Sequence, residues 1–194
     1  LADFISYAIG NYPADRYALF IDSQGAGWKG VSADSSRARK QVIRNPRQRD
    51  AIQIGELGDA VSGLGLDLIA FDASLMAMIE VADEVSSGAD TMVASQAVRP
   101  ATGFRYDWIV DELCNDPTVS THHFARDIVG AYNGAHGGVS EIWSLSAIDL
   151  TAPFETLMTE VDEFAAALGA VEEPTRKPDE VGALDDHGYD YSVQ

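Results

Sequence analysis

Three short apolar runs set the strongest limit on how this chain folds. They read YALFID at 17–22, LDLIAFDA at 66–73 and DTMVASQ at 90–96, and their length and composition are typical of strands buried on both faces. Segments with helical periodicity separate them, and a fourth candidate strand lies at 140–150. Strands that alternate with helices predict an α/β fold, in which helices cover both faces of a mostly parallel sheet.

Helical periodicity accounts for much of the remaining sequence. A first helix is expected to bury one face, made of Leu1, Phe4, Ile5, Ala8 and Ile9. Residues 74–87 predict a helix whose inward face is made of Leu75, Met78, Ile79, Ala82 and Val85. Shorter helices are expected within 54–65, near 107–114 and at 120–136.

The C-terminal part of the chain divides at about Gly169. Before it, an amphipathic helix is expected with an apolar face made of Phe154, Leu157, Met158, Val161, Phe164 and Leu168. After it, the sequence is acidic and contains proline, which is typical of a mobile segment. We therefore expect a domain at 1–170 and an acidic flexible tail at 171–194.

The formal net charge of -18 restricts the partners of the chain. It argues against nucleic acid and against an anionic membrane surface, and it is compatible with a basic partner, with cations or with solubility alone. No apolar run approaches the length of a membrane span. The single cysteine, Cys114, excludes an internal disulfide and is expected to be a small core or surface residue.

Two strand ends are the candidate functional positions, because functional groups in parallel sheets gather beyond the carboxyl ends of strands. The first strand runs into FIDSQGAGW, a glycine turn with Gln24 at its tip. Asp22 precedes this turn and is expected to act as a structural cap. The second strand ends in Asp72-Ala73-Ser74.

At these strand ends the sequence resembles the clostripain family of cysteine peptidases, and the resemblance extends from about Leu1 to Leu168. The family turn N-H-G-G-G-W is matched by SQGAGW, and the family segment F-D-A-C-L-M is matched by FDASLM. ADTMVASQAVRPATGFRYDW resembles the segment that walls the substrate pocket, and WSLSAIDL resembles a strand near the end of the domain. The resemblance implies a caspase-like fold, with the first two strands of the family domain missing from this chain.

The resemblance places Gln24 at the position of the catalytic histidine and Ser74 at that of the catalytic cysteine. A serine hydroxyl is a poor nucleophile without a positioned base, and a glutamine amide does not take up a proton near neutral pH. We therefore expect a catalytically impaired homologue that acts as a binding or scaffolding subunit. The alternatives are an Arg/Lys-specific cysteine endopeptidase in an inactivated form, or a serine hydrolase that recruits another histidine.

Four histidines are available as a substitute base. His122 and His123 fall within a predicted helix, where a lone histidine is more often a surface or core residue. His136 lies in GAHGG, which is expected to be a flexible loop, and recruiting it to a site is the least favoured of the alternatives. His187 lies in the acidic tail.

Asp72 is retained at a position that, in the family, helps to form the pocket for an arginine or lysine side chain. A carboxylate at the bottom of a cleft pairs with a guanidinium through charge-assisted bonds. The alternative is that Asp72 caps the helix predicted at 74–87. The two roles are compatible, and binding would make a protein or peptide with basic side chains the expected partner.

Six of the 13 lysines and arginines fall in RARKQVIRNPRQR. This segment is either a solvated loop or, by the family resemblance, a processing loop that is cut in trans or lies across Asp72 as a pseudosubstrate. A nucleic-acid patch is disfavoured because aromatic residues are not interleaved with the charges. The six residues are Arg37, Arg39, Lys40, Arg44, Arg47 and Arg49.

The resemblance carries three further expectations. Another chain or segment is expected to complete the sheet, because missing strands would expose its edge. Calcium is the one candidate cofactor, since some relatives need it, but no spacing such as D-x-[DN]-x-[DN]-G is present and we assign no metal ligands. An extracellular or cell-surface location is favoured.

Overall fold

The computed structural model describes residues 1–32, 51–136 and 143–170. These residues divide into two units, one within Leu1–Glu155 and one that begins at Thr156. The basic segment from Arg37 to Arg49 and the acidic tail at 171–194 lie outside the described residues. The expectations for both therefore stay predictions.

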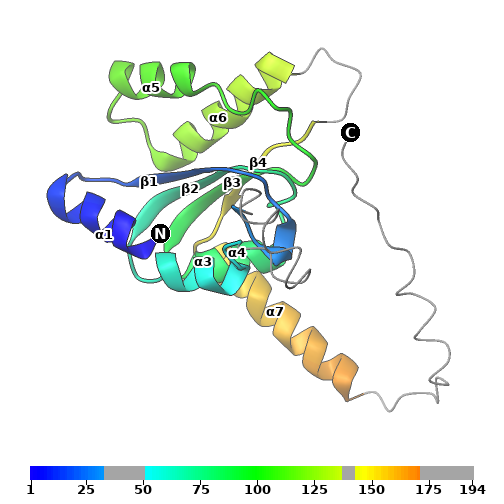
Figure 1. Cartoon of the computed structure of the whole chain (residues 1–194). Helices are drawn as coiled ribbons and strands as arrows, with labels where there is room; N and C mark the ends of the chain where they lie inside the picture. The colour runs from blue at the N-terminus through cyan, green and yellow to red at the C-terminus, as the bar shows by residue number, and fades with distance from the viewer. Residues whose placement is uncertain (33–50, 137–142, 171–194) are drawn as a thin grey trace, which may run out of the picture. The chain divides into compact units, whose positions relative to one another are not determined.

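A four-stranded sheet forms the centre of the Leu1–Glu155 unit (Figure 1). Its strands are β1 Ala18–Asp22, β2 Leu66–Asp72, β3 Ala89–Ala94 and β4 Ser146–Asp149. They are ordered β1-β2-β3-β4, with β1, β2 and β3 parallel and β4 antiparallel to β3. The predicted mostly parallel sheet is confirmed.

Helices lie on both faces of this sheet, as predicted (Figure 1). Helices α5 (Tyr106–Asn115) and α6 (Thr121–His136) cover one face. Helices α3 (Ile54–Val61) and α4 (Ile79–Ser86) cover the other. The other helices in the described residues are α1 Ala2–Asn11, the 3-10 turn η1 Gly27–Lys29 and α7 Ala152–Gly169.

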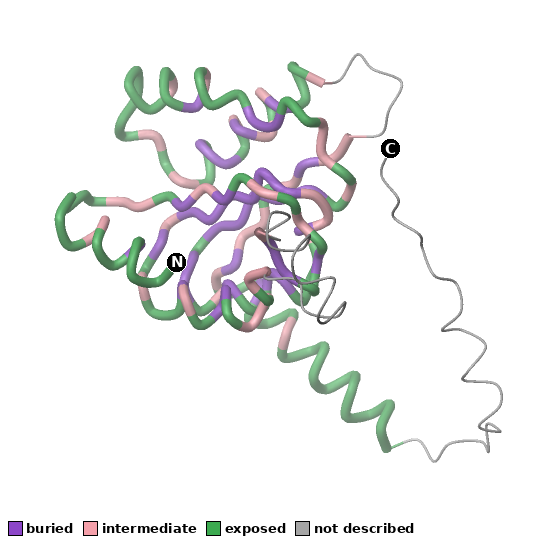
Figure 2. The backbone as a smooth tube through the Cα atoms, viewed as in Figure 1, coloured by how far each residue is buried: buried purple, intermediate pink, exposed green. Residues whose placement is uncertain are grey.

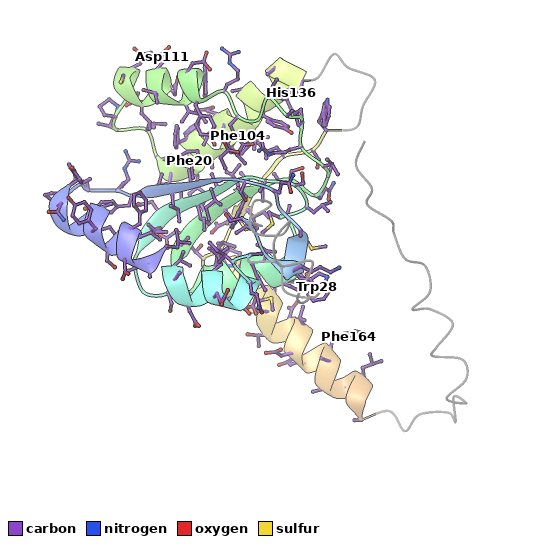
Figure 3. All side chains as sticks on the ribbon, in the orientation of Figure 1. Phe20, Trp28, Phe104, Asp111, His136 and Phe164 are labelled. Carbon is purple, nitrogen blue, oxygen red and sulfur yellow. The ribbon has the colours of Figure 1, made fainter. Side chains whose placement is uncertain are left out.

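Strand β2 is buried almost throughout, because its alternate side chains face two different helical layers (Figure 2). Leu68 and Ala70 belong to the core cluster that contains Phe104 and is formed with α5 and α6. Figure 3 places Phe20 and Phe104 between the sheet and these two helices. The fully apolar sequence of β2 is thus explained by burial on both sides.

The helix predicted at 74–87 begins five residues later than expected, at Ile79. The preceding turn is instead hydrogen-bonded to the segment that follows β3: the Leu75 amide donates to the Ala97 carbonyl at 3.1 Å, and the Ala77 amide donates to the Ser95 carbonyl at 3.0 Å. These bonds replace the helical pattern. Sequence periodicity does not reveal them, because their acceptors lie on another strand end.

The late start of α4 also changes which side chains it buries. Ala82 and Val85 are buried as predicted, whereas Met78 and Ile79 are exposed. Leu75 lies in the turn with a φ of 65°, a left-handed backbone that a leucine rarely adopts. The prediction of five inward-facing positions was therefore wrong for the first three.

Two amphipathic helices are less buried than their sequences indicate. In α1, Ile5 is buried, while Leu1 and Phe4 are exposed. In α7, Phe154 is buried within the Leu1–Glu155 unit. The exposed members of the predicted α7 face are Leu157, Val161, Phe164 and Leu168. Periodicity predicted the helices but not the extent of their burial.

Asp149 connects the end of β4 to the start of α7. Its Oδ1 accepts hydrogen bonds from the Thr151 hydroxyl at 2.6 Å and from the Thr151 amide at 2.9 Å. Both bonds favour the charged carboxylate, the hydroxyl bond most, and they lower the pKa of Asp149 below its ordinary value of 3.8. The resulting stability is present above pH 3.8 and is lost as the pH falls through the lowered pKa.

This effect gives a first prediction. Thr151→Ala is expected to raise the pKa of Asp149 toward 3.8, because it removes the largest cause of the shift. An NMR titration of the carboxyl carbon measures it, with Thr118→Ala, whose hydroxyl bonds Asp116 instead, as the matched control. An Asp149 pKa unchanged by Thr151→Ala would contradict the hydrogen bond.

Candidate ligand site at the ends of β1 and β2

The parallel register of β1 and β2 pairs Asp22 with Asp72, and the Ser23 amide donates to the Asp72 carbonyl at 3.2 Å. The two turns that follow are therefore neighbours. A Cβ placed on Gly25 would lie 2.1 Å from the Ser74 carbonyl oxygen, so a glycine is needed where the turns touch. The structure brings the Gln24 turn and the Ser74 turn together at one edge of the sheet.

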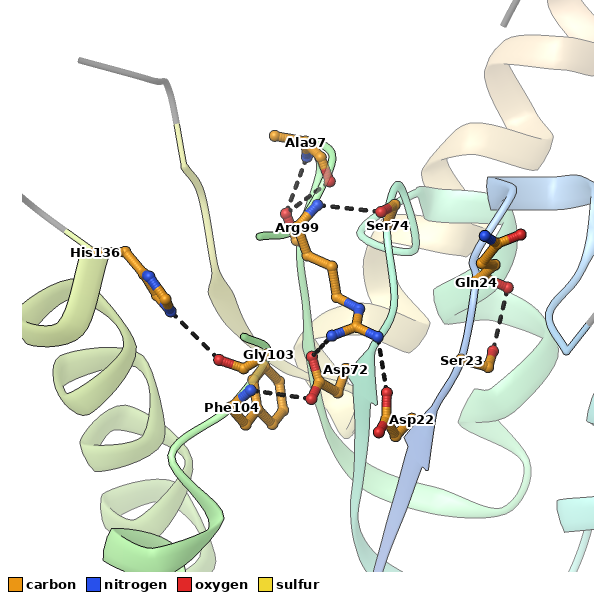
Figure 4. Close-up of polar contacts among 11 residues, drawn as sticks. Asp22, Ser23, Gln24, Asp72, Ser74, Ala97, Arg99, Gly103, Phe104 and His136 are labelled. Atoms are coloured by element: carbon orange, nitrogen blue, oxygen red, sulfur yellow. Dashed lines mark hydrogen bonds and ion pairs between the residues drawn. The ribbon is translucent and has the colours of Figure 1, made fainter. Parts of the chain in front are cut away.

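The side chains of Gln24 and Ser74 are not joined by a hydrogen bond (Figure 4). Ser74 Oγ accepts a bond from the Arg99 amide at 3.1 Å. The backbone carbonyl of Gln24 accepts from the Ser32 amide at 3.2 Å and from the Ser23 hydroxyl at 3.1 Å. These bonds hold the turn, and the glutamine side chain itself carries no group that takes up a proton near neutral pH.

None of the described histidines is hydrogen-bonded to Ser74 or to Gln24. His136 is the last residue of α6 rather than part of a loop, and its Nε2 lies 3.3 Å from the Gly103 carbonyl. Its ring also packs edge-on against Tyr132, with 4.7 Å between centroids. His122 and His123 are exposed on α6. His187 is outside the described residues, and Cys114 is exposed on α5.

Asp72 is the most buried carboxylate of the site, at 1% exposure. Its Oδ2 accepts a hydrogen bond from the Phe104 amide at 2.9 Å. It does not cap a helix, because α4 begins seven residues later, at Ile79. The capping alternative is therefore wrong.

Arg99 lies between two carboxylates in this site (Figure 4). Its Nη1 lies 3.0 Å from Asp72 Oδ1, and its Nη2 lies 2.7 Å from Asp22 Oδ1. Asp22 is thus an ion-pair partner rather than a cap. Sequence reasoning missed Arg99, although the arginine stands in the segment that resembles the pocket wall, directly before Pro100.

Gly103 makes room for this ion pair. A Cβ at this position would lie 2.4 Å from Asp72 Oδ2 and 2.7 Å from Arg99 Nη1. Its φ of 60° also belongs to the left-handed region that favours glycine. The loop from Arg99 to Phe104 therefore wraps the Asp72 carboxylate with the arginine at one end and a backbone donor at the other.

The electrostatic balance of the site is negative, with two carboxylates for one guanidinium. Burial and then the Asp72 charge raise the pKa of Tyr106 well above its ordinary value of 10. The same two causes raise the pKa of Tyr132, which is 2% exposed. Both phenols therefore remain neutral hydrogen-bonding groups near the carboxylate at physiological pH.

A cleft of about 700 Å³ lies at the opposite ends of the strands. Its lining includes Arg16, Tyr17, Asp67 and Phe124. Arg16 donates to the Pro117 carbonyl at 2.7 Å and to the Val119 carbonyl. The volume of this cleft does not make it the candidate site, because the residues expected to carry chemistry lie at the carboxyl ends of the strands.

In 1–32, 51–136 and 143–170, no three or more His, Cys, Asp or Glu residues are grouped to hold a metal ion. The described residues thus provide no fit for calcium, and we derive no step through it. No helix in these ranges is both long and apolar enough to cross a bilayer.

Solved structures of C11 cysteine proteases share this architecture. A secreted C11 cysteine protease from Bacteroides thetaiotaomicron, in complex with an irreversible peptide inhibitor, aligns with a TM-score of 0.61 at 23% identity, over 81% of this chain and 46% of that chain. An inactive zymogen C11 protease from Parabacteroides distasonis aligns with a TM-score of 0.56 at 26% identity, over 84% of this chain and 40% of that chain. The fold is that of the C11 cysteine proteases.

Sequence comparison agrees with the fold. The profile of the Clostripain family matches residues 1–193. Clostripain from Hathewaya histolytica is 34% identical over 125 residues, which cover 58% of this chain and 23% of that protein. The chain belongs to the Clostripain family, which confirms the resemblance, and it spans less than half the length of these relatives.

Proposed function

We propose that this chain is a non-catalytic Clostripain-family domain that binds or scaffolds a protein partner. The observation that carries the proposal is the environment of Ser74. Its hydroxyl oxygen accepts from the Arg99 amide, and the turn beside it presents Gln24. An acyl-transfer site needs a base at this place to activate the nucleophile and to protonate the leaving group.

The other described groups support the same conclusion. His136 Nε2 faces the Gly103 carbonyl, and the carboxylates of Asp22 and Asp72 are paired with Arg99. Both carboxylates therefore contact a guanidinium, and the Ser74 hydroxyl oxygen accepts from a backbone amide rather than donating to either of them. We infer that none of these groups replaces a catalytic histidine.

A basic protein surface or peptide is the partner that the charges favour. The chain carries a formal net charge of -18, which attracts basic partners over long range. Asp72 is retained at the position where, by family resemblance, a basic side chain is recognised. We place the interaction outside the cell, since one structural relative is described as secreted.

The sheet offers a second contact for a partner. Among the described strands, β1 is an edge strand, with β2 as its one neighbour in the sheet. An edge strand leaves backbone donors and acceptors for a further strand. We propose that another chain or segment pairs with β1 and completes the sheet.

Peptide cleavage tests the proposed lack of catalysis. The purified chain is expected to cleave Arg- and Lys-containing peptides at least about 10⁴-fold more slowly than clostripain from Hathewaya histolytica, because loss of one member of a catalytic pair costs that much or more. Cleavage is followed by mass spectrometry, with Ser74→Ala as the matched control. Turnover that disappears in Ser74→Ala would refute the proposal.

A further inference from the structure

We propose that Asp22 and Asp72 together form a binding site for a guanidinium or amidinium cation, and that Arg99 of the same chain is its displaceable occupant. The inference rests on the proposed function in one respect, which is that Asp72 recognises a basic group. It adds Asp22 as a second recognition residue and an internal side chain that controls access.

The depth of the two carboxylates supports a built site. Asp72 is 1% exposed and forms the floor, while the Asp22 side chain is 61% exposed and forms the rim. The Arg99 guanidinium spans them at 3.0 and 2.7 Å. A planar cation with several N–H donors is the chemical group that bridges two carboxylates in this way.

Arg99 satisfies the charge of Asp72 but not its hydrogen-bonding capacity. The 3.0 Å contact between Nη1 and Asp72 Oδ1 is an ion pair without hydrogen-bond alignment, and Oδ1 has no donor of good geometry although the Tyr106 hydroxyl interacts with this carboxylate. Tyr132 is a buried residue whose pKa is raised by burial and then by the Asp72 charge. Its hydroxyl also has no hydrogen-bond partner among the described residues. An external cation that reached either atom with better alignment would therefore gain contacts that Arg99 does not make.

The side chain of Arg99 is able to leave without unfolding its loop. The Arg99 backbone is held separately by its bond to Ser74 Oγ, and Pro100 restricts it to an extended conformation. The side chain is 19% exposed and pairs with the exposed rim carboxylate, which gives it a path to solvent. An incoming cation would contact the same two carboxylates that Arg99 contacts. In the wild type it must therefore displace the Arg99 side chain, which weakens its binding.

Calorimetric titration of the full chain with N-ethylguanidinium chloride tests the inference. Arg99→Ala is expected to bind it saturably with a Kd on the order of 1 mM, the range for so small a ligand. The wild type, Arg99→Ala/Asp72→Asn and Arg99→Ala/Asp22→Asn are each expected to bind at least about tenfold more weakly, because a competing cation or one fewer carboxylate weakens the site. Asparagine at position 72 keeps an acceptor for the Phe104 amide.

Two controls address charge and folding. Arg105→Ala removes an exposed ion pair with Asp107 and is expected to create no such site. Tetramethylammonium, which has the same charge and no N–H donor, is expected not to compete. If Arg99→Ala does not fold alone, recovery of its folded fraction by N-ethylguanidinium and not by tetramethylammonium is the supporting result.

The inference is overturned if folded Arg99→Ala shows no saturable binding, if binding survives both asparagine substitutions, or if the ligand does not restore folding of an unfolded variant. These readouts do not depend on turnover. A cleaving wild type with a guanidinium-binding Arg99→Ala variant would refute the proposed function alone. A non-cleaving wild type without such binding would refute this inference alone.

Discussion

Gly103→Ala is expected to lower the free energy of unfolding of the Leu1–Glu155 unit by about 3 kcal/mol, through backbone strain and disruption of a buried ion pair. The new Cβ would lie 2.4 Å from Asp72 Oδ2, a buried atom already bonded to the Phe104 amide. The φ of 60° adds strain, because a side chain disfavours this region. Neither the floor carboxylate nor the loop backbone moves without breaking these contacts.

Urea denaturation followed by tryptophan fluorescence measures this effect, since all three tryptophans lie in that unit. The matched control is Gly130→Ala on the exposed surface of α6, where a Cβ meets nothing within 4 Å. It is expected to stabilise the unit by up to about 1 kcal/mol, because alanine is the better helix former. Equal effects of the two substitutions would contradict the packing of Gly103 against the ion pair.

Restoring a histidine beside a cysteine is expected to activate the thiol. In a Cys114→Ser background, Ser74→Cys alone should react with iodoacetamide as an ordinary thiol of pKa about 8.5. Adding Gln24→His should raise the alkylation rate at pH 6 by about tenfold, because an imidazolium lowers the thiol pKa, although the lower pKa also reduces intrinsic nucleophilicity. The reason to expect contact is the close approach of the two turns at Gly25.

Gln24→Asn is the matched control for this experiment, since it alters the same position without adding a titratable ring. It is expected to leave the alkylation rate of Ser74→Cys unchanged. A rate that does not increase with Gln24→His would show that positions 24 and 74 do not face each other as a catalytic pair does. The readout requires no peptide substrate and so does not depend on the rest of a family protein.

Much of the fold was predictable from local pattern. The runs containing β1, β2 and β3 are apolar because helices cover both faces of the sheet, so composition alone indicates their burial. The parallel arrangement follows from the helical segments between them. The start of α4 was not predictable, because the turn before it is held by carbonyl groups of Ser95 and Ala97 from another part of the chain.

The residues of the candidate site also fall into some that the sequence identified and others that it did not. Gln24, Asp72 and Ser74 were identifiable because they directly follow or end apolar strands and because their motifs resemble a family. The functions of Asp22 and Arg99 were not, since their ion pair joins residues 77 positions apart. The role of Gly103 was also not predictable, because the Asp72 carboxylate that needs the space beside it comes from a distant part of the sequence.

The sequence by itself determined the class of fold, the positions of the two strand ends and the identity of the groups there, since these depend on apolar periodicity and residue type. Tertiary structure alone decided that the Asp72 carboxylate is already paired. Coulombic attraction selects the nearest cation in space, and the register of β1 and β2 together with the loop after β3 placed that cation on Arg99.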